Sequence, residues 1–160
     1  MKRILPLLIV LLLFSLLLAA CSGGDSGNKP LPAGEELVKT LTDAGIFDDE
    51  LEAVDPVIAA LLYGFTEEDG IELHSWLSSS GGTAEEFSLI VCQDDAALTA
   101  ARKSAEARLE NQKRTYESYA PNEVPKLEGA VVRVRDKVLV VCVAADPEKA
   151  AKLLAPYFPA

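Results

Sequence analysis

Residues 95–119 read DAALTAARKSAEARLENQKRTYESY, and this stretch has the clearest period in the chain. Small or apolar side chains recur every three or four residues, which predicts one long amphipathic helix with a single buried stripe. Asp94 or Asp95 can cap its start, and Pro121 lies just beyond its end. Because several stripe positions are alanine, we expect close packing on a flat partner, most simply a β-sheet. The stripe consists of Leu98, Ala101, Ala105, Leu109, Gln112, Tyr116 and Tyr119.

The segments on either side of this helix have the two-residue alternation of β-strands. Residues 71–77 and 86–93 alternate in this way and are joined by a glycine-containing turn, so they predict a hairpin. Residues 127–135 and 138–144 predict a second hairpin. The segment 138–144 is apolar on both faces, which is typical of a central strand.

Shorter helices complete the pattern. One is predicted from residue 35 to about 44, a second from Asp55-Pro56 to Gly64, and a last one from Asp146-Pro147 to about residue 157. The second has an apolar face made of Val57, Ile58, Leu61 and Leu62. The sequence therefore predicts an α+β fold with a four-stranded, mainly antiparallel sheet, built as strand-strand-helix twice. We expect the helices on one face of this sheet, preceded by two short helices.

The amino-terminal residues predict export. Lys2 and Arg3 precede an apolar run that is too short for a comfortable transmembrane helix, and small residues follow it, as in a secretory signal. The sequence Leu18-Ala19-Ala20-Cys21 resembles the lipobox of bacterial lipoproteins. That resemblance implies recognition of Leu18, Ala19 and Ala20 by the signal peptidase, and diacylation of the Cys21 thiol. Two acyl chains anchor a protein stably to a membrane. The alternative is an uncleaved signal anchor.

These features divide the chain into three parts. Residues 1–20 are the predicted signal peptide, residues 21–34 are a flexible tether rich in Gly, Ser and Pro, and residues 35–160 form a single α+β domain. We expect the domain to be held at the extracytoplasmic face of the cell membrane through its lipid anchor.

Composition limits the partners and cofactors. Residues 21–160 contain 13 basic and 25 acidic residues, a formal charge of −12, which argues against binding to nucleic acid. With a single histidine and no Cys-x-x-Cys pair, the chain cannot build an ordinary zinc site. We expect no metal and no cofactor, and a partner that is an envelope protein or ligand of unknown identity.

Cys92 and Cys142 are the two cysteines besides Cys21. A disulfide between them is permitted outside the membrane, provided that their strand faces match. Two buried free thiols are the other interpretation, since free cysteine behaves as a small core residue.

The candidate chemistry is sparse. His74 is the only imidazole, and its neighbour Ser75 points to the opposite side of the same strand, so the two cannot form a catalytic pair. Trp76 shares a strand face with His74 and Glu72. If exposed, these three side chains are a candidate surface site that could hold a sugar or peptide by stacking. If buried, Trp76 is part of the core.

Several segments carry a wider resemblance. They are Tyr63-Gly64, Gly82 to Phe87, Arg108 to Lys113, Tyr119-Ala120-Pro121 with Glu123-Val124, Gly129 to Val132, and Val138 to Val141. Together they resemble the domain-of-unknown-function family numbered 4358, small lipoproteins found mainly in Gram-positive anaerobes. The resemblance implies a lipoprotein on the outer face of the plasma membrane, and it supplies no activity.

The sequence thus predicts a membrane-anchored, non-enzymatic binding or accessory domain of the cell envelope. A cell-wall-directed hydrolase and a small-ligand carrier are the alternatives. A deep pocket lined by His74 and acidic residues would favour the hydrolase, whereas an exposed apolar patch would favour a partner site.

Overall fold

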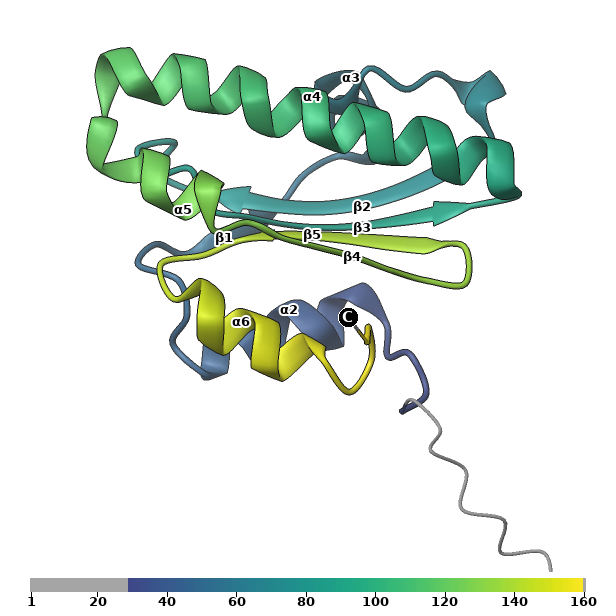
Figure 1. The fold of residues 1–160 in the computed structure, drawn as a ribbon, viewed down its shortest axis with the longest axis horizontal. Helices are drawn as coiled ribbons and strands as arrows, with labels where there is room; N and C mark the ends of the chain where they lie inside the picture. Colours follow the sequence, from purple (N-terminus) through teal and green to yellow (C-terminus); the bar gives the residue numbers. More distant parts are fainter. Residues whose placement is uncertain (1–28, 160) are drawn as a thin grey trace, which may run out of the picture.

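The computed structural model describes residues 29–159. These residues form an α+β domain in which one antiparallel sheet is the middle layer (Figure 1). The predicted signal peptide, with Leu18, Ala19, Ala20 and Cys21, lies outside the described residues. In chain order the elements are α2 (Gly34–Asp43), β1 (Leu51–Ala53), α3 (Pro56–Tyr63), the 3₁₀ turn η1 (Glu67–Asp69), β2 (Ile71–Ser78), β3 (Glu86–Cys92), α4 (Asp95–Tyr119), the 3₁₀ turn η2 (Pro121–Glu123), α5 (Val124–Glu128), β4 (Val131–Arg135), β5 (Val138–Val143) and α6 (Pro147–Leu154).

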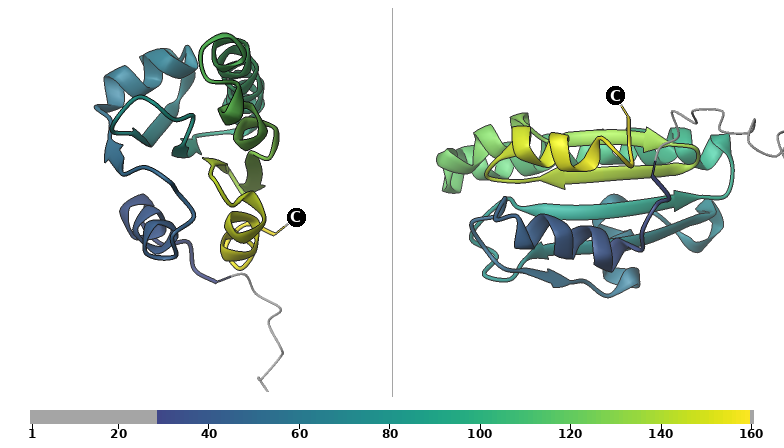
Figure 2. Two further views of the ribbon diagram at one scale, coloured as in Figure 1. Left: turned by 90° about the vertical axis from the view of Figure 1, so that its left-hand side faces the viewer. Right: turned by 90° about the horizontal axis from the view of Figure 1, so that it is seen from below.

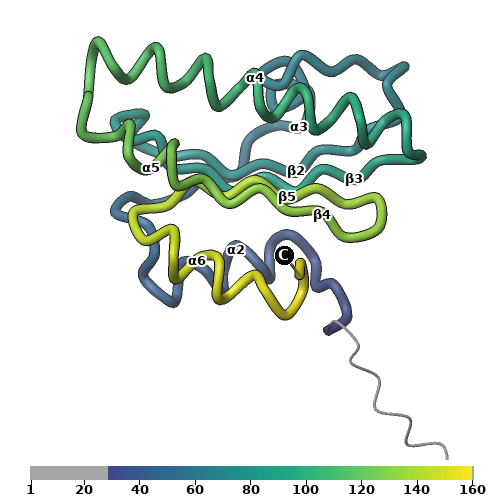
Figure 3. Tube along the Cα trace, in the orientation of Figure 1, coloured from purple at the N-terminus to yellow at the C-terminus, as the bar shows by residue number. Residues whose placement is uncertain are grey.

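The sheet has five strands in the order β1-β2-β3-β5-β4, and all neighbours are antiparallel. Figure 3 shows β2, β3, β5 and β4 following one another in this order. Both predicted hairpins are confirmed, and β5 is central, as its apolar character indicates. The prediction of four strands was wrong because it omitted β1. That strand has only three residues, too few for a period of two to stand out.

Helices cover both faces of the sheet, so the prediction that they pack on one face was wrong. Figure 2 shows α3, α4 and α5 on one side and α2 and α6 on the other. The physical reason lies in β3, where Phe87 and Leu89 pack in the α2–α6 core while Ile90 and Cys92 pack in the α3–α4 core. A strand that is apolar on both faces needs a covering layer on each.

The long helix α4 has the predicted bounds. The Asp94 side chain caps it by accepting a hydrogen bond of 2.8 Å from the backbone N–H of Ala97. Ala101 and Ala105 are fully buried against the sheet, which explains why small residues occupy these stripe positions. Tyr119 departs from the expected stripe because the residue is 60% exposed, although its hydroxyl donates to the Gly81 carbonyl.

Two predicted boundaries are corrected by the structure. The third strand does not begin at Leu127, since this residue is buried within α5 and the strand starts at Val131. The predicted tether, residues 21–34, is too long at its carboxyl end, because residues 29–34 already belong to the folded domain. Leu31 packs against the α2–α6 core, and the Lys29 N–H donates to the Pro156 carbonyl. An alternating apolar pattern cannot tell a short packed helix from the start of a strand.

Candidate functional site

The most unusual surface of the domain is on α3. Asp55 caps this helix by accepting a hydrogen bond from the Val57 N–H, and Gly64 ends it in the left-handed conformation, both as predicted. The side of α3 that packs on the sheet carries the buried Ala59 and Tyr63, with Ala60 partly buried beside them. The large aliphatic side chains of the predicted apolar face point outwards. They are Val57 (68% exposed), Ile58 (54%), Leu61 (70%) and Leu62 (43%), and we call them the α3 surface.

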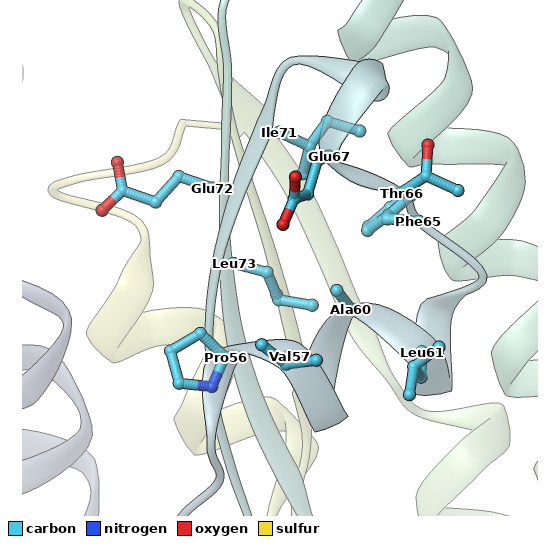
Figure 4. A pocket seen from close by; sticks show the side chains of 10 residues that line it. All are labelled: Pro56, Val57, Ala60, Leu61, Phe65, Thr66, Glu67, Ile71, Glu72 and Leu73. Carbon is cyan, nitrogen blue, oxygen red and sulfur yellow. The ribbon is translucent and has the colours of Figure 1, made fainter.

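A pocket lies between α3 and the outer edge of β2 (Figure 4). Its volume is about 460 Å³, and we call it the edge pocket. Figure 4 shows Leu73 directed towards α3, Glu67 directed into the pocket, and Glu72 directed to the opposite side of the strand. Most of its lining is apolar, and it adjoins the α3 surface through Val57 and Leu61. The lining residues are Pro56, Val57, Ala60, Leu61, Phe65, Thr66, Glu67, Ile71, Glu72 and Leu73.

The chain around this pocket is acidic. From Leu51 to Ser75 it contains no lysine or arginine, and its acids are Glu52, Asp55, Glu67, Glu68, Asp69 and Glu72. Glu67 is exposed and points into the pocket, whereas the exposed Glu72 side chain lies on the other side of the bordering strand. An apolar hollow with carboxylates at its rim suits an apolar group that is flanked by positive charge.

The predicted site of His74, Trp76 and Glu72 is only partly assembled. The three side chains share the α2–α6 face of β2, and His74 Nε2 lies 3.0 Å from Glu72 Oε1. Trp76 is half-buried in the core, with its ring centroid 5.7 Å from that of Phe87. A Cβ atom at Gly34 of α2 would lie 2.8 Å from the Trp76 ring, so α2 covers the ring closely. Trp76 therefore packs mainly against the core, as the second of the two interpretations predicts.

Opposite faces of the sheet separate His74 from Ser75, and Cys92 from Cys142. The Ser75 hydroxyl is buried on the α4 side, where it hydrogen bonds with Ser88. Cys92 and Cys142 are free thiols in cores on opposite faces of the sheet, so no disulfide joins them. Burial raises the pKa of Cys142 to about 12, which makes it an unreactive core residue.

A buried polar cluster, which we call the Glu86 network, joins α3, α4 and the sheet. The Glu86 side chain is 1% exposed, and it accepts hydrogen bonds from Arg108 Nε (2.9 Å) and Nη2 (2.7 Å) and from the Tyr63 hydroxyl (2.5 Å). Ser88 donates to the same carboxylate. Burial, together with the Glu86 charge, raises the pKa of Tyr63 well above its ordinary value. Burial alone would lower the pKa of Arg108, but Glu86 outweighs this effect and the pKa is raised.

A second cluster, the Lys126 network, ties α5 to the loop before β1. Lys126 Nζ lies 2.9 Å from Asp48, 3.1 Å from Glu85 and 3.2 Å from Glu123. The fully buried Glu85 carboxylate also accepts the backbone N–H groups of Asp48 and Asp49. Burial acts to lower the pKa of Lys126, and the hydrogen bonds to these carboxylates raise it above its usual value. Every buried carboxylate in this cluster is thus matched by donors.

The sequence predicts a strand that begins at Glu86, and neither network was foreseen from it. The available signal was a pair of adjacent acids at the start of a strand that is buried on both faces. Adjacent strand residues point to opposite faces, so each acid needed its own partner. The same residues, with Arg108, Tyr63 and Glu123, belong to the segments that carry the family resemblance. Their contacts in this structure hold elements together, and we assign them no chemistry.

Two further observations bear on the kind of site. Within residues 29–159, no three His, Cys, Asp or Glu side chains are grouped as ligands for a metal ion. Among the helices that the structure describes, none has the length and apolar character needed to cross a membrane.

Fold and surface together define a small α+β domain with helices on both faces of an antiparallel sheet and one helix whose apolar side is left open. The family described as "Domain of unknown function (DUF4358)" matches residues 48–144, and the chain belongs to this family. The match spans all five strands and α3 to α5, and leaves out α2 and α6. No curated protein matches the chain, and no solved structure matches it.

Proposed function

We propose that this protein is a membrane-anchored lipoprotein of the cell envelope whose folded domain binds a protein partner through the α3 surface. The observation that carries the proposal is the exposure of the four large aliphatic side chains on one short helix, next to the edge pocket. Contiguous apolar surface of this kind is a liability for an isolated soluble domain and is typical of an interaction site.

The geometry favours binding over hydrolysis. His74 is exposed beside Glu72, while the Ser75 hydroxyl is buried on the other face of the strand. The buried carboxylates Glu85 and Glu86 are paired with Lys126 and Arg108 and are inaccessible to a substrate. The apolar edge pocket contains neither His74 nor these pairs.

Photo-crosslinking in intact cells tests the partner site. With p-benzoylphenylalanine in place of Leu61 in the full chain, we expect a discrete crosslinked species of higher mass. Adding Val57→Asp should reduce its yield at least about tenfold, because a charge in the centre of an apolar contact is strongly unfavourable. Leu61 and Val57 are 70% and 68% exposed, so these changes leave the fold intact.

The matched control places the same crosslinker at Glu106, an exposed position on α4. We expect no discrete species there. Identical products from both positions, or a product at Leu61 that Val57→Asp does not reduce, would show that the α3 surface is not the partner site.

Lipid anchoring is tested separately. We expect the wild-type chain to incorporate radiolabelled palmitate in a bacterial host, and Cys21→Ser to lose the label completely, because acylation needs the thiol. Cys92→Ser and Cys142→Ser are the controls and should keep full labelling, since both thiols are buried in the folded domain. Equal labelling of the Cys21→Ser chain would rule out the anchor.

A further inference from the structure

The outer edge of β2 is only half covered. The short strand β1 pairs with residues 76–78 of β2, and the Val54 N–H donates to the Ser75 carbonyl at 2.9 Å. The chain then turns into α3, and among the described residues no strand pairs with the outer side of residues 71–74. An unpaired strand edge presents free backbone donors and acceptors to other chains.

The hydrogen bonds of the sheet identify which groups are free. Gly70 and Ser78 point their backbone groups towards β3, because the Gly70 carbonyl accepts from Gln93 and the Ser78 N–H donates to Glu85. In an antiparallel ladder successive residues point their backbone groups to alternate sides, so the odd-numbered residues of β2 point both groups away from β3, as the Ser75 carbonyl does when it accepts from Val54. The N–H and C=O groups of Ile71 and Leu73 therefore face outwards.

These groups border the edge pocket. Ile71, Glu72 and Leu73 all line it, although the Glu72 side chain points to the other side of the strand (Figure 4). The pocket therefore reaches the backbone edge of β2. A peptide that runs along this edge would place alternate side chains in the pocket and next to Glu72.

We propose that the edge pocket binds an extended segment of the partner, added to β2 as an antiparallel strand, with apolar side chains on the α3 side and basic side chains on the Glu72 side. This inference rests on the proposed function and specifies the partner's chemistry. Backbone hydrogen bonds to Ile71 and Leu73 supply affinity, and the pocket supplies selectivity for apolar residues. The absence of lysine and arginine between Leu51 and Ser75 favours a cationic segment.

The probe is the fluorescent peptide acetyl-Lys-Val-Lys-Leu-Lys-Val-Lys-amide, titrated by anisotropy against the full chain in phosphatidylcholine nanodiscs. Peptide residues that pair with Ile71 and Leu73 place their side chains on the same face of the sheet as these two residues. They also direct their N–H groups at β2. N-methylation of the valine and leucine amides should therefore weaken binding at least about tenfold, through lost hydrogen bonds and a steric clash. N-methylation of the lysine amides, which face solvent, should leave the affinity within about twofold.

A protein variant tests the charge preference. Glu72→Lys should weaken binding roughly fivefold at low salt, because it replaces an attraction beside the added strand with a repulsion. Glu106→Lys on α4 makes the same charge change at an exposed position and should have no effect.

The other outcomes each overturn the proposal. Equal sensitivity to both N-methylation patterns, or to neither, excludes strand addition. If the probe does not bind but the chain still crosslinks through Leu61, an added strand is excluded, and the proposal that a partner binds the α3 surface is unaffected. A chain that sediments as a dimer, and becomes monomeric with Glu72→Lys, assigns the edge to a second copy. If the probe does not bind and the Leu61 crosslink also fails, the proposed binding of a partner to the α3 surface is itself contradicted.

Discussion

Arg108→Met is expected to destabilise the domain by about 3–5 kcal/mol, because it leaves the Glu86 carboxylate buried without its positive partner. Glu86 is 1% exposed, so water cannot replace the three hydrogen bonds that it loses from the guanidinium Nε and Nη2 groups. The remaining donors, Tyr63 and Ser88, are neutral and do not compensate the charge. Urea unfolding followed by the fluorescence of Trp76, the only tryptophan, should show a midpoint lowered by at least about 1 M.

Two comparisons separate the buried charge from the general loss of an arginine. Arg114→Met on the exposed side of α4 removes a hydrogen bond to Asn111 and should change stability by less than about 0.5 kcal/mol. The double variant Glu86→Leu with Arg108→Met removes both charges and should recover most of the loss, since buried ion pairs are often replaceable by apolar residues. A double variant as unstable as Arg108→Met would contradict this account.

Lys126→Met has the next largest expected effect, a loss of about 3 kcal/mol, because three carboxylates then face one another across a partly buried site. Glu85 and Glu123 have side chains that are 0% and 7% exposed, and Lys126 is their common cation. The effect on Glu85 is moderated by the backbone N–H groups of Asp48 and Asp49, which remain as donors. Urea unfolding at neutral pH measures the loss.

The pH dependence identifies the cause. The carboxylates around Lys126 raise its pKa in the folded state, so the stability that this lysine contributes is present below its ordinary pKa and is lost as the pH rises through the folded value. The difference in stability between the wild type and Lys126→Met should therefore shrink as the pH rises above 10.5. Lys113→Met is the control, because this lysine lies 3.7 Å from Glu110 and from Glu128, both well exposed. An equal loss from both lysine variants at all pH values would exclude charge clustering as the cause.

The sequence predicted the local structure well where a long period or a cap was present. The bounds of α4, the caps of α3 and α6 and the antiparallel hairpins depend on side chains close together in the chain, so each could be predicted locally. The strand β1 and the boundary at Leu127 could not, because segments of three to five residues carry too little periodic information.

The candidate site illustrates the limit more sharply. Periodicity marked Val57, Ile58, Leu61 and Leu62 as an apolar face, and the apolar face of a surface helix ordinarily packs on the core. The structure packs α3 through Ala59 and Tyr63 instead. Tyr63 faces the sheet because its hydroxyl donates a hydrogen bond to Glu86 and its ring lies under the Arg108 guanidinium. A partner that lies in another part of the chain cannot be inferred from the helix's own sequence.

The amino-acid sequence by itself determined the α+β class, the secondary structure with strong periods, and the expectation of an exported and lipidated chain, since all of these depend on local pattern. Tertiary structure decided the placement of helices on both faces, the pairing of the buried acids, and the exposure of α3. These features depend on contacts between residues far apart in the chain, such as Glu86 with Arg108 and Glu85 with Lys126. The sequence shows which side chains are apolar or charged. Whether such a side chain is buried, paired or available to bind depends on its neighbours in space.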